Sequence, residues 1–366
     1  MNLNIMQINP VFIIAEAGVN HNGSVEMALQ LVDEAAKAGA DAVKFQTFKS
    51  EAVISRFAVK AEYQKQTTGA EDTQLEMVRR LELDAAAHHR IKDRCEERGI
   101  QFLSTPFDLE SLHLLVREFD LPIIKIPSGE ITNAPFLIEI AKTGRKLILS
   151  TGMSTLGEIE TALQVLAFGA LESKAKPSLE AFRDAYESDA GQAILKERLT
   201  LLHCTTEYPA PLDQVNLRVI KTMRQAFGLP VGYSDHTEGI AISIAAVALG
   251  ACVIEKHFTL DTNLPGPDHQ ASLEPQELVE LVKGIRATEL AMGNTAKIAT
   301  PAERANRTVA RKSLVALRAV KKGEVFTLQN LACKRTLEGG LSSLFFWDWL
   351  GKESPKSYQE DEAIKP

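Results

Sequence analysis

Two lysines interrupt apolar runs of the sequence and are the first sign of chemistry. Lys44 and Lys125 each lie within a short run that is otherwise mostly apolar. An unpaired ammonium is costly to bury, so each lysine needs an anionic partner. That partner is either a nearby carboxylate such as Glu16 or Glu130, or a bound phosphate or carboxylate; a Schiff-base role is a further possibility. Hydroxyl residues at the ends of other runs favour the bound anion.

Two histidines, His236 and His257, end consecutive apolar runs in the second half of the chain. If these runs are adjacent strands, the two imidazoles lie side by side, with Glu16 and Glu255 near them. Imidazole and carboxylate groups together suit a divalent metal ion. A hydrogen-bonded structural role is the alternative for each histidine, and it is our interpretation of His203. We expect surface positions for His88, His89 and His113.

The elements that must position these residues recur eight times, as a short apolar run followed by a helix-like segment. Continuous apolar runs suit a parallel sheet that is buried on both faces. After a predicted helix cap at Ser24, apolar residues recur at helical spacing until Gly39. Eight such units over about 290 residues predict a TIM (β/α)8 barrel. An open doubly wound sheet is the alternative, but the turn 18–23 lacks the GxGxxG spacing. The eight runs are Phe12–Val19, Ala42–Thr47, Gln101–Phe107, Ile123–Ser128, Lys146–Gly152, Leu199–Thr205, Pro230–His236 and Cys252–Phe258.

Active sites of such barrels lie at the C-terminal ends of the strands, so polar residues at these ends are expected to line one pocket. A stiff loop, Pro265–His269, follows the last run, and Asp268 is the residue in it that we expect to reach inward. The strand-end residues are Glu16, Lys44, Gln46, Thr105, Lys125, Ser128, Glu130, Ser150, Ser234, His236, Glu255 and His257.

The chain is expected to contain a barrel domain over residues 1–293 and a smaller domain after it. Residues 294–307 are polar and are interpreted as a linker. Residues 308–353 are interpreted as a small, mostly irregular or β domain, and the charged tail 354–366 is expected to fray. Residues 171–198 are interpreted as a helical insertion between the fifth and sixth strands.

Composition narrows the classes of function. The 366 residues are 45% hydrophobic and 24% charged, which suits a globular protein with a large core. With 41 basic and 48 acidic residues, the net charge of -7 argues against general binding to nucleic acid or to a membrane surface. No apolar stretch approaches the roughly 18 residues of a membrane span. The four cysteines are scattered without CxxC pairs, so we expect a cytoplasmic protein.

Seven motifs stand in order at the predicted strand ends: FIIAEAGVNHNG (12–23), KFQ (44–46), STPF (104–107), KIPSGE (125–130), STGM (150–153), GYSDH (232–236) and EKHF (255–258). Together they resemble the bacterial sialic acid synthase family. Residues 310–315 and 321–324 resemble the antifreeze-like, or SAF, domain that closes these enzymes. The resemblance therefore covers nearly the whole chain, and it implies the same barrel followed by a β-clip domain.

The resemblance implies that phosphoenolpyruvate condenses with an N-acetylated aminosugar, such as N-acetylmannosamine, to give a nine-carbon 2-keto acid and phosphate by C–O cleavage. In such a reaction Mn²⁺ or Mg²⁺ bound by His236 and His257 would polarise the sugar aldehyde, and Glu255 is the candidate carboxylate for the attacking water. The implied phosphoenolpyruvate contacts are Lys44, Thr105, Lys125, Ser128, Ser150 and Ser234. The implied sugar contacts are Glu16, Gln46, Glu130, Tyr208 and Asp268.

The resemblance also implies a domain-swapped homodimer in which the small domain of one chain caps the barrel of the other. That domain contributes an arginine to the sugar in the family, and Arg335 matches its position. Two departures from the family pattern are Thr336-Leu337 in place of Pro-Gly and Thr206 in place of Asn.

Four alternatives to this function remain open. An N,N'-diacetyllegionaminic acid synthase, which uses a 2,4-diacetamido-2,4,6-trideoxymannose, shares most of the motifs, and a pseudaminic acid synthase fits them less well. A Schiff-base aldolase on the same fold would use Lys44 or Lys125 covalently, without a metal. A non-enzymatic sugar-binding protein is suggested only by the antifreeze-like domain, and the polar residues at all eight strand ends argue against it.

Overall fold

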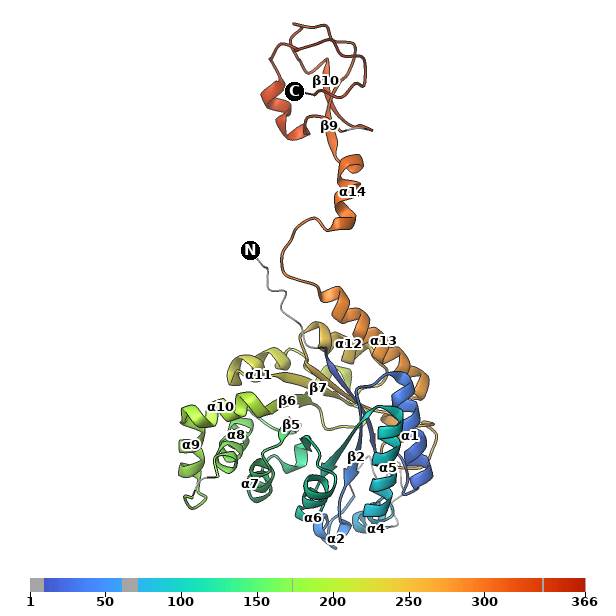
Figure 1. The fold of residues 1–366 in the computed structure, drawn as a ribbon, viewed down its shortest axis with the longest axis vertical. Helices are drawn as coiled ribbons and strands as arrows, with labels where there is room; N and C mark the ends of the chain where they lie inside the picture. Colours follow the sequence, from blue (N-terminus) through green and yellow to red (C-terminus); the bar gives the residue numbers. More distant parts are fainter. Residues whose placement is uncertain (1–9, 61–71, 173, 338, 366) are drawn as a thin grey trace. The chain divides into compact units, whose positions relative to one another are not determined.

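A computed structural model describes residues 10–60, 72–172, 174–337 and 339–365. The chain divides into two units after Gly293, and each unit has its own hydrophobic core (Figure 1). Among the described residues, no helix is both long enough and apolar enough to cross a membrane.

Eight parallel strands form the centre of the first unit. They are β1 (Phe12–Gly18), β2 (Ala42–Thr47), β3 (Gln101–Pro106), β4 (Ile123–Ile126), β5 (Lys146–Ser150), β6 (Leu199–Cys204), β7 (Val231–Asp235) and β8 (Val253–His257). The paired strands run in the order β3-β2-β1-β8-β7-β6-β5-β4, and β3 packs against β4, which closes the sheet into a barrel. The TIM-barrel prediction is confirmed, and each strand lies within its predicted run.

Helices surround the strands of the barrel (Figure 1). They are α1 (Val25–Ala38), α2 (Ser50–Val53), α4 (Gln74–Arg79), α5 (Ala85–Arg98), α6 (Leu109–His113), α7 (Ala134–Lys142), α8 (Leu156–Ala170), α9 (Leu179–Glu187), α10 (Asp189–Arg198), α11 (Val219–Phe227), α12 (Ala241–Ala248) and α13 (Pro275–Met292). Short π and 3-10 turns are η1 (Leu114–Glu118), η2 (Ser128–Glu130), η3 (Leu212–Gln214) and η4 (His269–Ala271). Helix α1 follows its predicted signals, because Ser24 caps its first turn and Gly39 ends it with a φ of 82°.

The interior of the barrel is layered, and the layering follows from the two-residue period of the strands. One buried apolar layer consists of Ile14, Ala42, Leu103, Ile148, Leu202 and Val253. Two residues further along their strands, five of these six positions are followed by a polar side chain: Glu16, Lys44, Thr105, Ser150 and Glu255. The apolar layer therefore forms a dry floor beneath a polar layer at the C-terminal ends of the strands.

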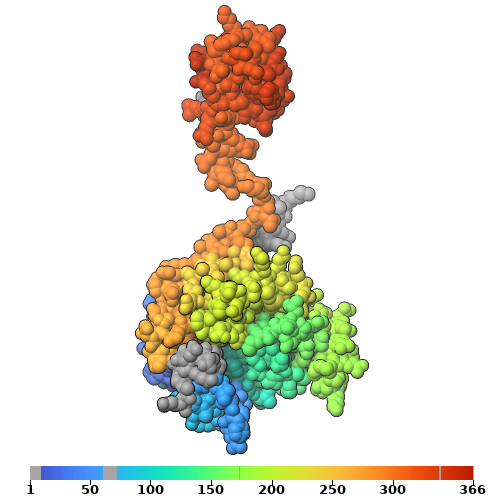
Figure 2. Space-filling view, turned by 180° about the vertical axis from the view of Figure 1, so that it is seen from behind, coloured from blue at the N-terminus to red at the C-terminus, as the bar shows by residue number. Residues whose placement is uncertain are grey.

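The predicted insertion 171–198 contributes two helices to the flank of the barrel. Helices α9 and α10 pack against α8, and Phe182 of α9 lies against Phe168 of α8 with ring centroids 5.1 Å apart. Figure 2 shows this segment as a protrusion at the side of the barrel unit.

The second unit contains α14 (Pro301–Ala310), β9 (Lys312–Ala316), β10 (Leu331–Arg335), η5 (Ser343–Phe345) and α15 (Phe346–Trp349). Strands β9 and β10 pair antiparallel around a small core. The expected linker 294–307 is partly wrong, because Thr300 caps a helix that begins at Pro301. All of the residues of this helix are exposed.

The expectation of a frayed tail over 354–366 is also wrong for the residues that the structure describes. Tyr358 and Ile364 are buried in the core of the second unit, at 2% and 0% exposure. Isolated bridges join Val320 to Tyr358 and Val315 to Ala363. The charged residues of this segment face solvent while two apolar side chains anchor it, so the small domain continues past residue 353.

Candidate active site

A pocket of about 460 Å³ lies at the C-terminal ends of the strands. Residues from the C-terminal parts of the strands and from loops that follow them surround it, and none of the described residues of 171–198 lines it. The structure brings together fourteen of the fifteen residues predicted for the site: Glu16, Lys44, Gln46, Thr105, Lys125, Ser128, Glu130, Ser150, Tyr208, Ser234, His236, Glu255, His257 and Asp268.

The two lysines share the bottom of the pocket with two carboxylates. Lys44 Nζ lies 2.5 Å from Glu16 Oε2 and 3.5 Å from Glu255 Oε2, and Lys125 Nζ lies 3.4 Å from Glu255 Oε1. All four side chains are almost completely buried. Lys44 thus has the carboxylate partner expected from the sequence, whereas the partner of Lys125 is Glu255 rather than Glu130.

Burial and the neighbouring charges shift the pKa values of the two carboxylates in opposite directions. Burial raises the pKa of Glu16 to about 7, because Lys44 stabilises the charged form by less than burial and the repulsion of Glu255 together destabilise it. Burial also opposes the charge of Glu255, but Lys125 and Lys44 outweigh it and lower the pKa of Glu255. The site therefore combines an ionised carboxylate with one that retains a proton more readily, which is the usual arrangement of an acid and a base.

The lysines differ in the same way. Burial disfavours the ammonium of Lys44, yet Glu16 and Glu255 outweigh burial and raise its pKa. Burial lowers the pKa of Lys125, because Glu255 offsets only part of the burial and Lys44 adds to it. The protein thus offsets only part of the cost of burying the charge of Lys125, and a bound anion would offset the rest.

Hydroxyl groups extend this ionic layer around the barrel. Thr105 Oγ1 accepts a hydrogen bond of 3.0 Å from Lys44 Nζ, and Ser234 Oγ donates one of 2.8 Å to Glu255 Oε1. Ser128 Oγ accepts a hydrogen bond from Gly152 N at 2.9 Å. Ser150 Oγ is buried and has no hydrogen-bond partner among the described residues, so it is free to bind a ligand.

The two histidines lie side by side, as predicted, with ring centroids 5.5 Å apart. Tyr208 stacks on His236 at 4.2 Å and meets His257 edge-on at 5.6 Å. Burial lowers the pKa of His236 to about 4. Burial and the neighbouring His236 lower that of His257 well below its usual value, so both imidazoles are neutral near pH 7.

These imidazoles fit a divalent metal ion. His236 Nδ1 lies 2.6 Å from the Thr205 carbonyl oxygen and donates to it, which leaves the lone pair on Nε2. His257 Nδ1 is buried without a hydrogen-bond partner among the described residues. Within the described ranges no group of three or more His, Cys, Asp or Glu side chains forms a metal site, so two histidines are the protein ligands available.

A second buried ion pair lies directly behind the histidines, on the outer face of the barrel. Asp235 and Lys256 are paired in the register of β7 and β8, and Lys256 Nζ lies 3.2 Å from Asp235 Oδ2. Because side chains alternate along a strand, this pair points outward while His236 and His257 point inward. The pair therefore holds the two strands in the register that places the histidines together.

The remaining polar residues line the upper part of the pocket. Asp268 is buried, and burial raises its pKa to about 6. Gln46 and Glu130 are half-buried at the pocket wall, and Glu130 Oε2 accepts a hydrogen bond from Asn133. Gly18 lies at a β-bulge with a φ of 53°, and a Cβ there would meet Glu16 Oε1 and the His257 ring at 3.4 and 3.5 Å. A glycine at this position leaves the site open.

Sequence reasoning missed one side of the pocket, which we call the apolar wall. It consists of Phe48, Val53, Ile54, Met77, Val78 and Leu81. These residues come from the segment between β2 and α5, where apolar residues on short helices cannot be distinguished from core residues by sequence pattern. Phe48 and Leu81 pack with Val19, Val78 and Phe107 in a small separate cluster.

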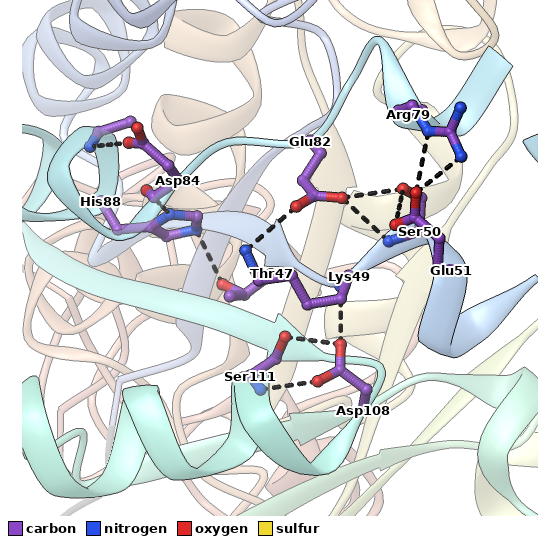
Figure 3. A network of polar contacts seen from close by, with 11 residues as sticks. Thr47, Lys49, Ser50, Glu51, Arg79, Glu82, Asp84, His88, Asp108 and Ser111 are labelled. Carbon is purple, nitrogen blue, oxygen red and sulfur yellow. Dashed lines mark hydrogen bonds and ion pairs between the residues drawn. The ribbon is translucent and has the colours of Figure 1, made fainter. Parts of the chain in front are cut away.

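A polar network braces this segment, and Figure 3 shows it. Glu82 Oε2 accepts hydrogen bonds of 3.0 and 2.9 Å from the backbone and hydroxyl of Ser50. Thr47 Oγ1 donates to His88 Nε2 at 2.9 Å, because His88 Nδ1 lies 2.9 Å from the Asp84 carbonyl and donates there. His88 is 0% exposed, so its predicted surface position is wrong: the histidine ties α5 to the end of β2.

Arg335, the fifteenth predicted residue, ends β10 in the second unit. It is exposed, and its Nε donates a hydrogen bond of 3.1 Å to the Ala310 carbonyl. His203 is a satisfied core histidine, as expected, with Nε2 2.6 Å from the Val215 carbonyl.

The fold and pocket define the class of this protein as a TIM-barrel enzyme with a buried ionic site at its strand ends. The NeuB family model matches residues 31–297, and the chain belongs to the NeuB family. It is 53% identical to N,N'-diacetyllegionaminic acid synthase of Campylobacter jejuni over 96% of this chain and 98% of that protein. A synthase of the same name from Legionella pneumophila is 43% identical, over 88% of this chain and 85% of that protein.

A solved structure has the same architecture. N-acetylneuraminic acid synthetase from Leptospira borgpetersenii, in complex with citrate, matches with a TM-score of 0.65 and 33% identity, covering 84% of this chain and 94% of that chain. The family resemblance seen in the sequence motifs is thus confirmed by independent comparisons.

Proposed function

We propose that this protein condenses phosphoenolpyruvate with 2,4-diacetamido-2,4,6-trideoxymannose and water to give N,N'-diacetyllegionaminic acid and phosphate. The motifs favoured N-acetylmannosamine, with the trideoxy sugar as the alternative. The 53% identity to a protein named for N,N'-diacetyllegionaminic acid supports the trideoxy sugar instead. The proposed enzyme acts in the cytoplasm as a homodimer.

One observation carries the reaction: two buried lysines and several hydroxyls meet in the same pocket as two neutral imidazoles. Phosphoenolpyruvate has a carboxylate and a phosphate, and Lys44, Lys125, Thr105 and Ser150 offer charge-assisted and neutral donors to them. Ser128 and Ser234 complete this set. A Schiff-base aldolase that uses Lys44 is less well supported, because Lys44 is held protonated between two carboxylates.

The proposed reaction forms a bond between C3 of phosphoenolpyruvate and the aldehyde carbon of the open-chain sugar. The aldehyde oxygen gains a proton and becomes a hydroxyl, and Glu16, with its raised pKa, is the proposed donor. Water then adds at C2, where the ionised Glu255 orients it, and the proton that the water loses restores the proton of Glu16. The C2–O bond to phosphate breaks as the C2 hydroxyl becomes a ketone, and the departing phosphate takes the proton. Atoms and charges balance, with hydrogen phosphate as the second product.

His236 and His257 are the proposed ligands of a Mn²⁺ or Mg²⁺ ion, with water and substrate oxygens completing its shell. When bound, this ion would supply Lewis-acid polarisation of the aldehyde. Gln46, Glu130, Tyr208 and Asp268 are proposed to hold the hydroxyl and acetamido groups of the sugar. Arg335 is proposed to reach the pocket of the partner chain, in an SAF-type domain.

The test is phosphate release from phosphoenolpyruvate in the presence of Mn²⁺, with mass detection of the product. Three arms contain the trideoxy sugar, N-acetylmannosamine or no acceptor. We expect the highest kcat/KM with the trideoxy sugar, and no release without an acceptor. A higher kcat/KM with N-acetylmannosamine would reject the acceptor, and release with neither sugar would reject the reaction.

A second measurement tests the bond that breaks. In H₂¹⁸O, C–O cleavage leaves the released phosphate unlabelled, because its four oxygens all come from phosphoenolpyruvate. One solvent oxygen in the phosphate would indicate attack at phosphorus and would contradict the proposed mechanism.

A further inference from the structure

The bottom of the pocket is charged, whereas the apolar wall is one of its sides. Its bottom contains Lys44, Lys125, Glu16 and Glu255, all almost fully buried. The apolar wall, by contrast, presents aliphatic and aromatic side chains to the same cavity. A ligand that fills this pocket is therefore expected to be charged or polar where it meets the bottom and apolar where it meets the apolar wall.

The apolar wall is a fixed part of the fold. Hydrogen bonds from Ser50 to Glu82 join the start of α2 to the residues after α4. The backbone of Lys49 donates to Asp108 at 2.8 Å, which ties the same segment to the loop after β3 (Figure 3). These polar bonds lie outside the pocket, so they tie the segment that carries the wall to the barrel without taking part in ligand binding.

The proposed reaction directs C4 to C6 of the acceptor away from the bottom of the pocket. The aldehyde carbon must lie beside phosphoenolpyruvate and the histidines, so C4 to C6 extend toward the sides of the cavity. In the trideoxy sugar this end carries a methyl group at C6 and an acetamido group at C4, whereas N-acetylmannosamine carries hydroxyls at both. A hydroxyl against an apolar wall loses its hydrogen bonds to water and gains none.

We propose that the apolar wall, through Val53 and Val78 in particular, selects an acceptor with a deoxy, acetamido-substituted end over a fully hydroxylated one. This inference rests on the proposed function and adds to it the residues that discriminate between acceptors. Removal of one methyl or addition of one hydroxyl in an apolar pocket changes specificity by about 10 to 200-fold, so a small number of side chains suffices.

The test replaces both valines with threonine, in the double variant Val53→Thr/Val78→Thr. Threonine has nearly the shape of valine, but its hydroxyl offers a hydrogen bond to a sugar hydroxyl. The matched control is Val279→Thr, a half-buried valine on α13 that does not line the pocket. Each variant is assayed for kcat/KM with both sugars and for the KM of phosphoenolpyruvate, and the melting temperature reports folding. The single variant Val78→Thr replaces the double one if the latter does not fold.

We expect the ratio of kcat/KM for the trideoxy sugar over N-acetylmannosamine to fall about tenfold in the double variant. The control keeps the wild-type ratio, and the KM of phosphoenolpyruvate stays unchanged in both. An unchanged ratio, or an equal loss with both sugars, would overturn the inference. Failure of the wild type to use the trideoxy sugar would overturn the proposed function and the inference with it, and that result is visible without any variant.

Discussion

Two buried lysine–carboxylate clusters lie on opposite faces of the barrel sheet, each with one residue from β8, and the two clusters are built differently. On the outer face, Lys256 pairs with Asp235. On the inner face, Lys44 and Lys125 share Glu255, and Lys44 also pairs with Glu16.

The outer cluster is saturated. Asp235 Oδ1 accepts hydrogen bonds from the backbone and the hydroxyl of Thr237, and Oδ2 accepts one of 2.6 Å from Ser243. Lys256 Nζ also donates to the Thr237 carbonyl. Each charged atom of this pair thus has protein partners, which leaves no role for a ligand.

In the inner cluster, by contrast, some buried polar atoms have no protein partner in the described part of the chain. Ser150 Oγ and His257 Nδ1 are buried without hydrogen-bond partners among the described residues. The comparison teaches that burial of a lysine pair does not by itself indicate a site. Buried polar atoms that lack hydrogen-bond partners around the pair do indicate a site, because a folded protein contains few such atoms.

The largest effect that would test this comparison is expected from Lys125→Met. Methionine keeps most of the volume but removes the donor to the substrate anion, so kcat/KM for phosphoenolpyruvate should fall about a thousandfold. The phosphate-release assay measures it, with the exposed Lys142→Met as control. A variant within tenfold of wild type would show that the inner cluster is structural, like the outer one.

The outer cluster should respond in stability instead. Lys256→Met leaves the Asp235 carboxylate buried without its cation, and we expect the free energy of unfolding in urea to fall by about 3 kcal/mol. The double variant Asp235→Asn/Lys256→Met removes both charges and should recover part of this loss. If Lys256→Met unfolds like wild type but loses the affinity for phosphoenolpyruvate, the assignment of the two faces is reversed.

His236→Gln tests whether the inner face also holds a metal ion. Loss of one of two protein ligands should weaken Mn²⁺ binding about 100-fold, as measured by calorimetry. His203→Gln is the matched control, since His203 bonds a carbonyl oxygen beside β6 and should leave affinity unchanged. Equal Mn²⁺ affinity in His236→Gln and wild type would exclude His236 as a ligand.

The smallest expected effect concerns Asp268 at the edge of the inner face. Burial raises its pKa to about 6, so the carboxylate gains a proton as the pH falls through about 6 and then no longer accepts hydrogen bonds from the sugar at both oxygens. We expect kcat/KM for the acceptor to fall about tenfold for each pH unit below about 6. In Asp268→Asn this limb of the pH profile should disappear, while a retained limb would assign it to another group.

The residues of the inner face were predictable, because the two-residue period of the strands and the barrel fold together decide which side chains point inward. A lysine or serine at the end of an apolar run must face either the barrel or the helices, and TIM barrels gather the inward residues at one mouth. Lys44, Lys125, His236 and His257 follow this rule. The partner of Lys125 was not predictable. Glu255 lies four strands later in the chain, and the orientation of its side chain determines how closely it approaches Lys44 and Lys125.

The predictions from sequence that proved wrong share one physical cause. His88 is buried where α5 packs against the end of β2 and hydrogen-bonds Thr47 there. Tyr358 and Ile364 are buried because their segment pairs with segments more than thirty residues earlier. The apolar wall needs its neighbours after β1 and β3 to become one side of a pocket. Local pattern shows that a residue is apolar or polar, but only tertiary contacts decide what it faces.

The pairing of Asp235 with Lys256 on one face and the closeness of His236 and His257 on the other restrict how the gene can vary. A codon gained or lost inside β7 or β8 would exchange the two faces, because a shift of one residue turns every side chain of a strand around. The ammonium would then enter the barrel and the imidazole would leave it. Length variation among descendants of this sequence should therefore be confined to the loops, while both strands keep a constant number of codons.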